Sequence, residues 1–483
     1  MKKVIVLLFL SLFIISTKLA AAVDIALPDI GDSAGALVSP QEEYRIGQAF
    51  YWRLQQSTDL IEDPEVNSYI QSLGYRLVAN SAAPNLPFTF FMVPDSSVNA
   101  FAAPGGFIGT HSGLLLTSQS EDELASVLAH EIAHITQRHL LRSFEKQKGM
   151  SLPMTAAMIA AALLGAADPA AGSAAIMAVQ AAGVQMQLDF TRAHEKEADN
   201  LGMVNLVQSG FDAHAMPRFF ERLQSESRFY TGNAVPEFLR THPVTTSRIA
   251  DARGRAASYP LQRQLSDDLQ FYLIREKLRV MTTTNLSELV EHYARAIKIG
   301  NSSNTIATRY GYSLALSKSG EYTKARQVLQ PLIDADDDRL SYQLALAEIE
   351  IQVGRLPAAL AIYQENQRLY PDDQALSLVQ VSALLLAHLP GEATDILLRQ
   401  LELGNPSQRL YRLLAQAQGE LGKKSQSHSW LAEYYYASGR LHAAADQLRL
   451  AAEFANRDEY LLSKITARLR EVEQTLVRMD ERQ

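Results

Sequence analysis

The chain has 483 residues, of which 47% are hydrophobic and 20% charged, and its formal net charge is -8. This length exceeds one ordinary hydrophobic core, so two domains, or a domain and a repeat array, are expected. The acidic balance, without a block of lysine and arginine, argues against nucleic acid as a partner. Because there is no cysteine, disulfides, a cysteine nucleophile and zinc-thiolate sites are excluded.

The first residues have the features of a secretory signal peptide. Lys2 and Lys3 precede an apolar run that extends to Ser16, and an Ala-x-Ala site ends at Ala22. We expect residues 1–22 to be cleaved during export, which places the mature chain in the periplasm of a bacterium with two membranes. An uncleaved anchor is the alternative, because Lys18 separates the apolar run from the cleavage site.

Two helices and then three short strands are expected before residue 111. Helical spacing of apolar residues predicts two helices within 41–79. Aromatic and β-branched residues predict a strand at 86–93, and shorter strands are predicted at 98–102 and 107–110, with a turn at Pro104 between them. We expect these strands to form a small antiparallel sheet.

Two imidazoles lie one helical turn apart in the stretch His130-Glu131-Ile132-Ala133-His134. In an α-helix residues i and i+4 share a face, so both rings can bind one zinc ion while Glu131 serves as general base for a water molecule. A helix is expected because acids follow Ser120, and either Ser118 or Ser120 can begin a capping box. Two core histidines bonded to backbone groups are the alternative.

Residues 150–186 are almost wholly small and apolar, and Asp168-Pro169 divides them. Each half is too short to cross a bilayer as a straight helix. We expect a helical hairpin packed through alanines, or a flap over a cleft. Shallow contact of residues 155–183 with a membrane surface is the alternative.

A third zinc ligand is required, and without cysteine it must be a histidine or a carboxylate. We select Glu195, in a helical stretch where Glu195 and Asp199 share a face at i, i+4. Asp199 then either accepts the N–H of a ligating imidazole or donates a proton at the reacting centre. A solvated charged helix is the alternative, and His194 and Glu197 are weaker candidates for the site.

His242 precedes Pro243, which favours an extended loop that reaches a site from outside a helix. Two functional roles compete for this residue. It either stabilises the oxyanion of a tetrahedral intermediate, or it occupies the open zinc position and keeps the enzyme latent. Local hydrogen bonding alone is the alternative.

From residue 268 onward one amphipathic helix follows another, with a repeat of 34 residues. The small or polar residues at the predicted turns stand at positions 320, 354, 388 and 422. Alanine stands five residues after the first three, and Ser427 after the fourth. This period and these positions match degenerate tetratricopeptide repeats. We expect about four repeats, then a further pair or a cap, with a concave surface that binds other proteins; an unrelated helical array is the alternative.

Four segments of the chain together resemble the HtpX and CAAX prenyl endopeptidase family of zinc metalloproteases. These segments are Asn99-Ala-Phe-Ala-Ala-Pro-Gly-Gly106, His130-Glu-Ile-Ala-His134, Glu195-x-x-x-Asp199 and Thr241-His-Pro243. Matched residue by residue, the resemblance implies that His130, His134 and Glu195 bind one zinc ion, that Glu131 is the general base and that Asp199 supports proton donation.

The resemblance also implies how substrate binds and what it is. It implies an extended substrate added to a sheet edge and bound by Phe101, Ala102, Gly106, Phe107 and Ile108. With the signal peptide and the repeats, it implies an endoprotease of the periplasm that acts on misfolded or stalled outer-membrane β-barrel proteins. Its repeats would dock these substrates or the β-barrel assembly machinery.

The sequence therefore predicts an α+β protein with three parts: a signal peptide at 1–22, a mainly helical zinc metalloprotease domain at 23–267 and a tetratricopeptide-like solenoid at 268–483. The predicted reaction is hydrolysis of internal peptide bonds, without a covalent intermediate. A chaperone-like adaptor, with a latent or structural zinc site, is the alternative function.

Overall fold

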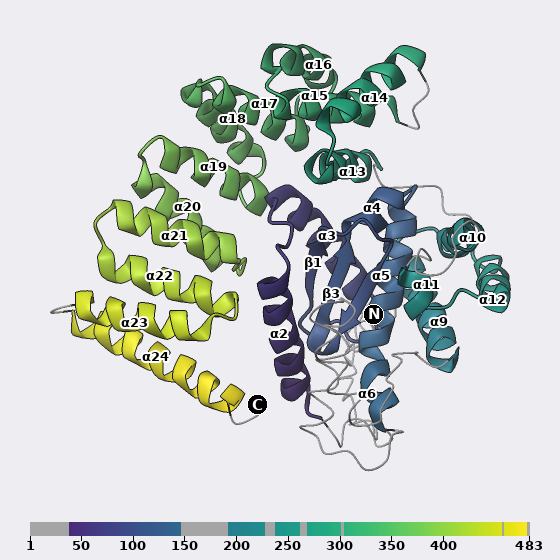
Figure 1. Cartoon of the computed structure of the whole chain (residues 1–483), viewed down its shortest axis with the longest axis horizontal. Helices are drawn as coiled ribbons and strands as arrows, with labels where there is room; N and C mark the ends of the chain where they lie inside the picture. Colours follow the sequence, from purple (N-terminus) through teal and green to yellow (C-terminus); the bar gives the residue numbers. More distant parts are fainter. Residues whose placement is uncertain are drawn as a thin grey trace, which may run out of the picture.

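The computed structural model describes residues 38–145, 192–227, 237–260, 268–300, 304–455 and 458–480. Over these ranges the chain forms a mainly helical domain with a three-stranded sheet, followed by an array of helices that curves beside α2 (Figure 1). The predicted α+β fold class is confirmed. No helix of the described ranges has the length and hydrophobicity required to cross a membrane. The predicted signal peptide and the apolar segment at 155–183 lie outside the described residues.

The first half of the chain supplies the sheet and the helices around it. Its first elements are α2 (Pro40–Ser57), α3 (Pro64–Val78), β1 (Thr89–Val93), β2 (Ala100–Ala103), the 3-10 turn η2 (Pro104–Gly106), β3 (Phe107–His111), α4 (Ser112–Thr117), α5 (Glu121–Thr136) and α6 (His139–Glu145). Its later elements are α9 (Arg192–Gln208), α10 (Ala215–Ser227), α11 (Glu237–Thr241) and α12 (Thr246–Ala256).

The sheet has the strand order β1-β3-β2 and is mixed. β2 pairs antiparallel with β3, because η2 joins them as a tight connection, whereas β1 pairs parallel with β3. The chain leaves β1, passes to the far side of β3 and only then forms β2, so β1 and β3 run in the same direction. The predicted antiparallel sheet is therefore correct for β2 and β3 and wrong for β1.

The turn between β2 and β3 requires glycine at Gly106. Its φ is 91°, in the left-handed region, and an added Cβ would lie 1.8 Å from the carbonyl oxygen of Pro87. Glycine adopts this conformation without a steric penalty and lets the two backbones approach. The turn in this way fixes β2 at one edge of the sheet.

The helix α5 begins where the sequence predicts and lies inside the domain. Ser120 Oγ accepts a hydrogen bond from the backbone N–H of Glu123 at 3.3 Å, whereas Ser118 Oγ donates to Leu114 O at the end of α4. Ser120 is therefore the N-cap. Every residue from Asp122 to His134 is buried, because α5 packs against β2, α3, α9 and α10. Any polar side chain at the centre of α5 must find its partners within the protein.

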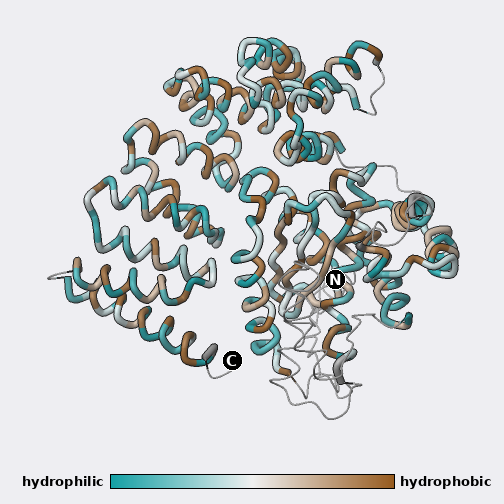
Figure 2. The backbone as a smooth tube through the Cα atoms, viewed as in Figure 1, coloured by the Kyte–Doolittle hydropathy of each residue, from teal (hydrophilic) through white to brown (hydrophobic). Residues whose placement is uncertain are grey.

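In the second half of the chain, the described residues form helices and no strand. Its elements are α13 (Leu269–Thr282), α14 (Leu286–Ile299), α15 (Thr305–Lys318), α16 (Tyr322–Ala335), α17 (Leu340–Gln352), α18 (Leu356–Leu369), α19 (Gln374–Leu386), α20 (Pro390–Glu402), α21 (Gln408–Glu420), α22 (Lys424–Ala437), α23 (Leu441–Ala455) and α24 (Glu459–Asp480). Hydrophobic and hydrophilic residues alternate within these helices (Figure 2), as amphipathic helices require.

The 34-residue period reappears in the backbone of the repeats. Gly320, Gly354, His388 and Gly422 all have a positive φ, between 57° and 84°, at the turns within α15–α16, α17–α18, α19–α20 and α21–α22. The alanines five residues after the first three turns are fully buried, which lets consecutive helices approach closely. The helices α23 and α24 follow as one further pair.

The helical array contacts the first domain near both of its ends. The helix α13 contributes Phe271 to the core of the first domain and Leu273 to the core of the first repeat. Near the other end, the ring of Trp52 on α2 lies 5.7 Å from that of Tyr436 on α22. The predicted boundary between 267 and 268 precedes a helix that serves both cores, and it stays a prediction.

Candidate metal centre

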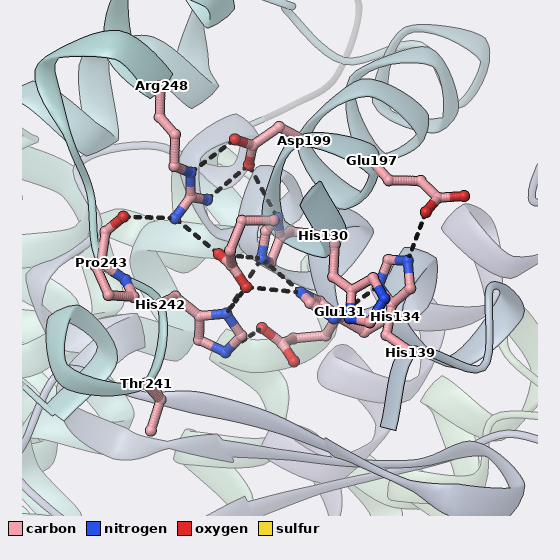
Figure 3. Close-up of polar contacts among 12 residues, drawn as sticks. His130, Glu131, His134, His139, Glu197, Asp199, Thr241, His242, Pro243 and Arg248 are labelled. Carbon is pink, nitrogen blue, oxygen red and sulfur yellow. Dashed lines mark hydrogen bonds and ion pairs between the residues drawn. The ribbon is translucent and has the colours of Figure 1, made fainter. Parts of the chain in front are cut away.

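Four buried donor groups meet between α5, α9 and the residue that follows α11 (Figure 3). His130 and His134 come from α5, Glu195 from the first turn of α9, and His242 from the end of α11. One potential ligand atom of each residue lies within 4.8 Å of all the others. His130 Nε2 is 3.0 Å from His134 Nε2 and 3.4 Å from His242 Nδ1.

The spacing and the charge of this cluster fit one zinc ion. Four ligands of a tetrahedral zinc, each about 2.1 Å from the metal, lie roughly 3.4 Å from one another. Glu195 Oε1 completes a set of that size, at 3.0 Å from His242 Nδ1 and 3.5 Å from His134 Nε2. Burial opposes a charge on His242, but Glu195 and Glu131 raise its pKa above the usual 6.5. Burial lowers the pKa of His134 well below 6.5, which favours the neutral ring that binds a metal.

Glu131 places a buried carboxylate beside the four donors. Neither of its oxygens has a hydrogen-bond partner among the described residues, and His242 Nε2 lies 3.6 Å from Oε1. Burial raises the pKa of Glu131 above its usual 4.5, although His242 and His130 partly offset this effect. A buried carboxylate without a partner is costly unless water or substrate satisfies it, and a raised pKa suits proton transfer.

Asp199 and Arg248 lie on the side of His130 that faces away from the other donors. Asp199 Oδ1 lies 3.1 Å from His130 Nδ1, the nitrogen that faces away from the cluster, and 2.7 Å from Arg248 Nη2. Burial opposes ionisation, but hydrogen bonds from Arg248 and His130 lower the pKa of Asp199 to about 2. An ionised Asp199 accepts the N–H of His130, so the geometry favours an orienting role over proton donation.

His134 is supported in a different way. Its Nδ1 lies 3.0 Å from Nδ1 of His139, and His139 Nε2 lies 3.2 Å from Glu197 Oε2 (Figure 3). The ring of His139 is fully buried, and its burial lowers its pKa to about 4, partly offset by Glu197. The ring of His194 stacks on that of His139, with centroids 4.6 Å apart and an angle of 8° between the planes.

The predicted substrate-binding residues do not all lie at a sheet edge. Phe101 and Ala102 are half-buried on β2, whose outer side pairs with no other strand of the described residues. Phe107 and Ile108 lie on β3, which pairs on both sides, so they cannot accept an added strand, and this prediction is wrong. Gly106 belongs to the turn. The short connection brings all five residues close together in sequence, but of the two strands they occupy, only β2 lies at an edge of the described sheet.

Sequence reasoning missed Arg248 and His139 as parts of the site. Arg248 binds both Asp199 and Glu195, and His139 contacts His134. The only signal for Arg248 was a basic residue shortly after the His242-Pro243 segment, and the signal for His139 was a third histidine five residues after His134. Neither spacing identifies a partner, because the contacts depend on how α6, α9 and α12 pack.

Comparison with known proteins assigns the family. Residues 64–256 match the family model of peptidase family M48. The beta-barrel assembly-enhancing protease of Escherichia coli K12 is 37% identical over 93% of this chain and 91% of its own length. The putative beta-barrel assembly-enhancing protease of Vibrio cholerae is 41% identical over 67% of each chain. A TPR protein of Thermus thermophilus covers 41% of this chain and 93% of its own length, with 21% identity and a TM-score of 0.22. The chain is a zinc metalloprotease of peptidase family M48, and it belongs to the family of the beta-barrel assembly-enhancing proteases.

Proposed function

We propose that this metalloprotease holds zinc with His130, His134 and Glu195 and cleaves internal peptide bonds with Glu131 as general base. The observation that carries the proposal is the buried carboxylate of Glu131, without a hydrogen-bond partner among the described residues, next to four converging donors. When bound, zinc supplies Lewis-acid polarisation of a carbonyl oxygen and makes a water molecule more acidic. Glu131 accepts the proton of the attacking water, and its burial keeps that proton available for the leaving amine.

His242 is proposed to hold the site closed. Its Nδ1 lies 3.0 Å from Glu195 Oε1 and 3.4 Å from His130 Nε2, and these short distances support the role of a fourth ligand over that of an oxyanion-stabilising group. A catalytic zinc requires an open position for water or substrate. We therefore propose that His242 leaves the cluster before the substrate binds.

The outer edge of β2 is proposed to bind the substrate as an added strand. A crevice of about 30 Å³ is lined by Ala102 and Ala103 of β2 and by His134 of α5, so one of the four donors lies beside this edge. A strand at this edge presents its backbone to the groups that act on a peptide bond. The outer side of β2 pairs with no other strand of the described residues, so an extended, unfolded segment would be the form of substrate that adds to it.

The substrates are proposed to be misfolded or stalled outer-membrane β-barrel proteins, met in the periplasm after cleavage of a signal peptide at 1–22. Support comes from the names of the relatives and from the array of repeats. The larger cavity, about 830 Å³, lies between the two halves of the chain and is rich in aromatic residues, including Tyr51 and Phe91 from the first domain and Tyr411 and Tyr436 from the repeats. We propose that this cavity and the repeats dock such proteins or their assembly machinery, with a domain boundary near 267.

The test compares wild-type protein with Glu131→Gln. Both should bind one zinc per chain, and the variant should cleave an unfolded outer-membrane β-barrel protein about 10²- to 10⁴-fold more slowly. The same β-barrel protein in its folded form is the control for strand addition and should be cleaved less, because its strands are already paired. Equal cleavage by the two proteins would exclude Glu131 as the base, and bound zinc without any cleavage would favour an adaptor.

A further inference from the structure

The two imidazoles of α5 present the same ring nitrogen, Nδ1, to the outside of the cluster, but the two nitrogens have different partners. His134 Nε2 faces the other donors, at 3.0 Å from His130 Nε2, so its Nδ1 is the outer nitrogen. A nitrogen that binds a metal carries no proton, and a neutral imidazole must then carry its proton on the other nitrogen. The buried Nδ1–H of His134 therefore needs an acceptor, and His139 Nδ1 lies 3.0 Å away.

The direction of this hydrogen bond fixes the protons of the next residue. If His139 Nδ1 accepts from His134, the proton of His139 is on Nε2, which lies 3.2 Å from Glu197 Oε2. Arg142 Nη1 lies 3.1 Å from the same oxygen and supports its negative charge. The donors and acceptors thus form one consistent chain: His134 donates to His139, and His139 donates to Glu197.

The backbone before His139 adopts a conformation that is uncommon for its residue type. Arg138 has a φ of 52°, and only one other non-glycine residue within the described ranges, His388, has a positive φ. Its guanidinium donates to Glu43 Oε1 and to Val38 O, both at 2.7 Å. This left-handed residue ends α5 and starts α6, and the reversal brings the ring of His139 against His134. Such a conformation persists only where its surroundings fix it.

We propose that His139 is a positioning residue of the metal centre, which accepts the Nδ1–H of His134 and relays its orientation to Glu197. The inference rests on the proposed function, because it requires zinc at Nε2 of His134. It makes α9 the anchor of both helical ligands, since Asp199 supports His130 directly and Glu197 supports His134 through His139. His194, stacked on His139, holds the plane of the relaying ring.

The proposal predicts which substitutions His139 tolerates. Asparagine carries an oxygen near the position of the histidine Nδ1 and can accept from His134, whereas leucine cannot. We expect His139→Leu to weaken zinc binding about 10- to 100-fold and His139→Asn to retain most of the affinity. Glu197 is half-exposed and is the last acceptor of the hydrogen-bond relay, so Glu197→Ala should weaken zinc binding by roughly tenfold. Lys196→Ala, on the same helix as Glu197 but paired with Asp251 outside the relay, should leave the zinc affinity unchanged.

The experiment measures the zinc dissociation constant of the full chain by competition with a chelating indicator, together with thermal unfolding of the zinc-free proteins. Histidine-selective ¹⁵N NMR of the zinc forms should give a protected Nδ1–H signal of His134 in wild type and His139→Asn, and none in His139→Leu. If His139→Leu fails to fold, the comparison of Glu197→Ala with Lys196→Ala decides the same question. Equal zinc affinity in wild type, His139→Leu and Glu197→Ala would overturn the role of His139 and leave the proposed function intact. Equal losses of zinc affinity in His139→Leu and His139→Asn would do the same. A wild-type chain that binds no zinc would overturn the proposed function, and the inference with it.

Discussion

Arg248 holds Asp199 through two hydrogen bonds, with Nε and Nη2 at 2.8 and 2.7 Å from the two carboxylate oxygens. Its Nη1 lies 2.7 Å from Glu195 Oε2, so one guanidinium pairs with two acids of α9. All three side chains are buried. Buried charges of this kind are stable only as a complete set, because each partner replaces water for the others.

Loss of Arg248 should therefore destabilise the protein strongly. We predict that Arg248→Met lowers the free energy of unfolding by about 3–5 kcal/mol, because two buried carboxylates lose their partner. Urea denaturation of the zinc-free protein gives this value. Arg253→Met on the same helix is the control, since Arg253 pairs with Glu221 in solvent, and its denaturation midpoint should stay near that of wild type. Similar losses in both variants would contradict the prediction.

The contact between Arg248 and Asp199 also predicts how the stability of the protein depends on pH. The pKa of Asp199 is lowered from 3.8 to about 2 in the folded protein. A carboxylate with a lowered pKa stabilises the fold above its unfolded pKa, and this stabilisation is lost as the pH falls through the folded value. The free energy of unfolding of wild type should therefore fall between about pH 4 and pH 2 as Asp199 becomes protonated. Asp199→Asn should lose less free energy of unfolding over the same range. Urea denaturation of zinc-free protein at several acidic pH values measures the difference, and parallel losses would argue against it.

The sequence could predict those parts of the site that lie on single helices. The i, i+4 spacing of His130 and His134 and the N-cap at Ser120 are local features, and the structure has the predicted helix with both rings in one cluster. The positions of Arg248 and His139 could not be predicted, because each meets its partners across two or three packed helices. Whether β1 runs parallel or antiparallel to β3 depends on the side of β3 on which the chain places β2. The alternation of apolar and polar side chains is the same in both arrangements, so the sequence does not predict this direction.

Removal of the His242 ring should activate the enzyme. We predict that His242→Ala retains zinc through His130, His134 and Glu195 and cleaves unfolded protein about tenfold faster or more, if the open form is at most about a tenth of the wild-type population. The measurement is the initial rate at saturating zinc. His214→Ala is the control, because His214 pairs with Asp212 outside the cluster. A slower His242→Ala would show that His242 assists the reaction, as an oxyanion-stabilising group does.

The repeats contain a matched pair of turns that differ in one residue type. His388 and Gly354 occupy equivalent positions with φ values of 57° and 77°. A side chain in this region costs about 1 kcal/mol relative to glycine. His388→Gly should therefore stabilise the repeats and Gly354→Ala destabilise them, each by roughly 1 kcal/mol. No atom lies within 4 Å of an added Cβ at Gly354, so only the backbone contributes. Chemical denaturation that finds the same sign for both would be inconsistent with this reasoning.

The helix α9 carries Glu195, Glu197 and Asp199 within five consecutive positions. One residue is a donor in the cluster, and the other two contact His139 and His130. Apart from His242, the donors of the centre come from two helices, α5 with its imidazoles and α9 with its carboxylates. A slide of α9 along α5 would remove a ligand and both anchors in one movement, so the pocket should gain or lose its metal cooperatively, as a unit, rather than one contact at a time.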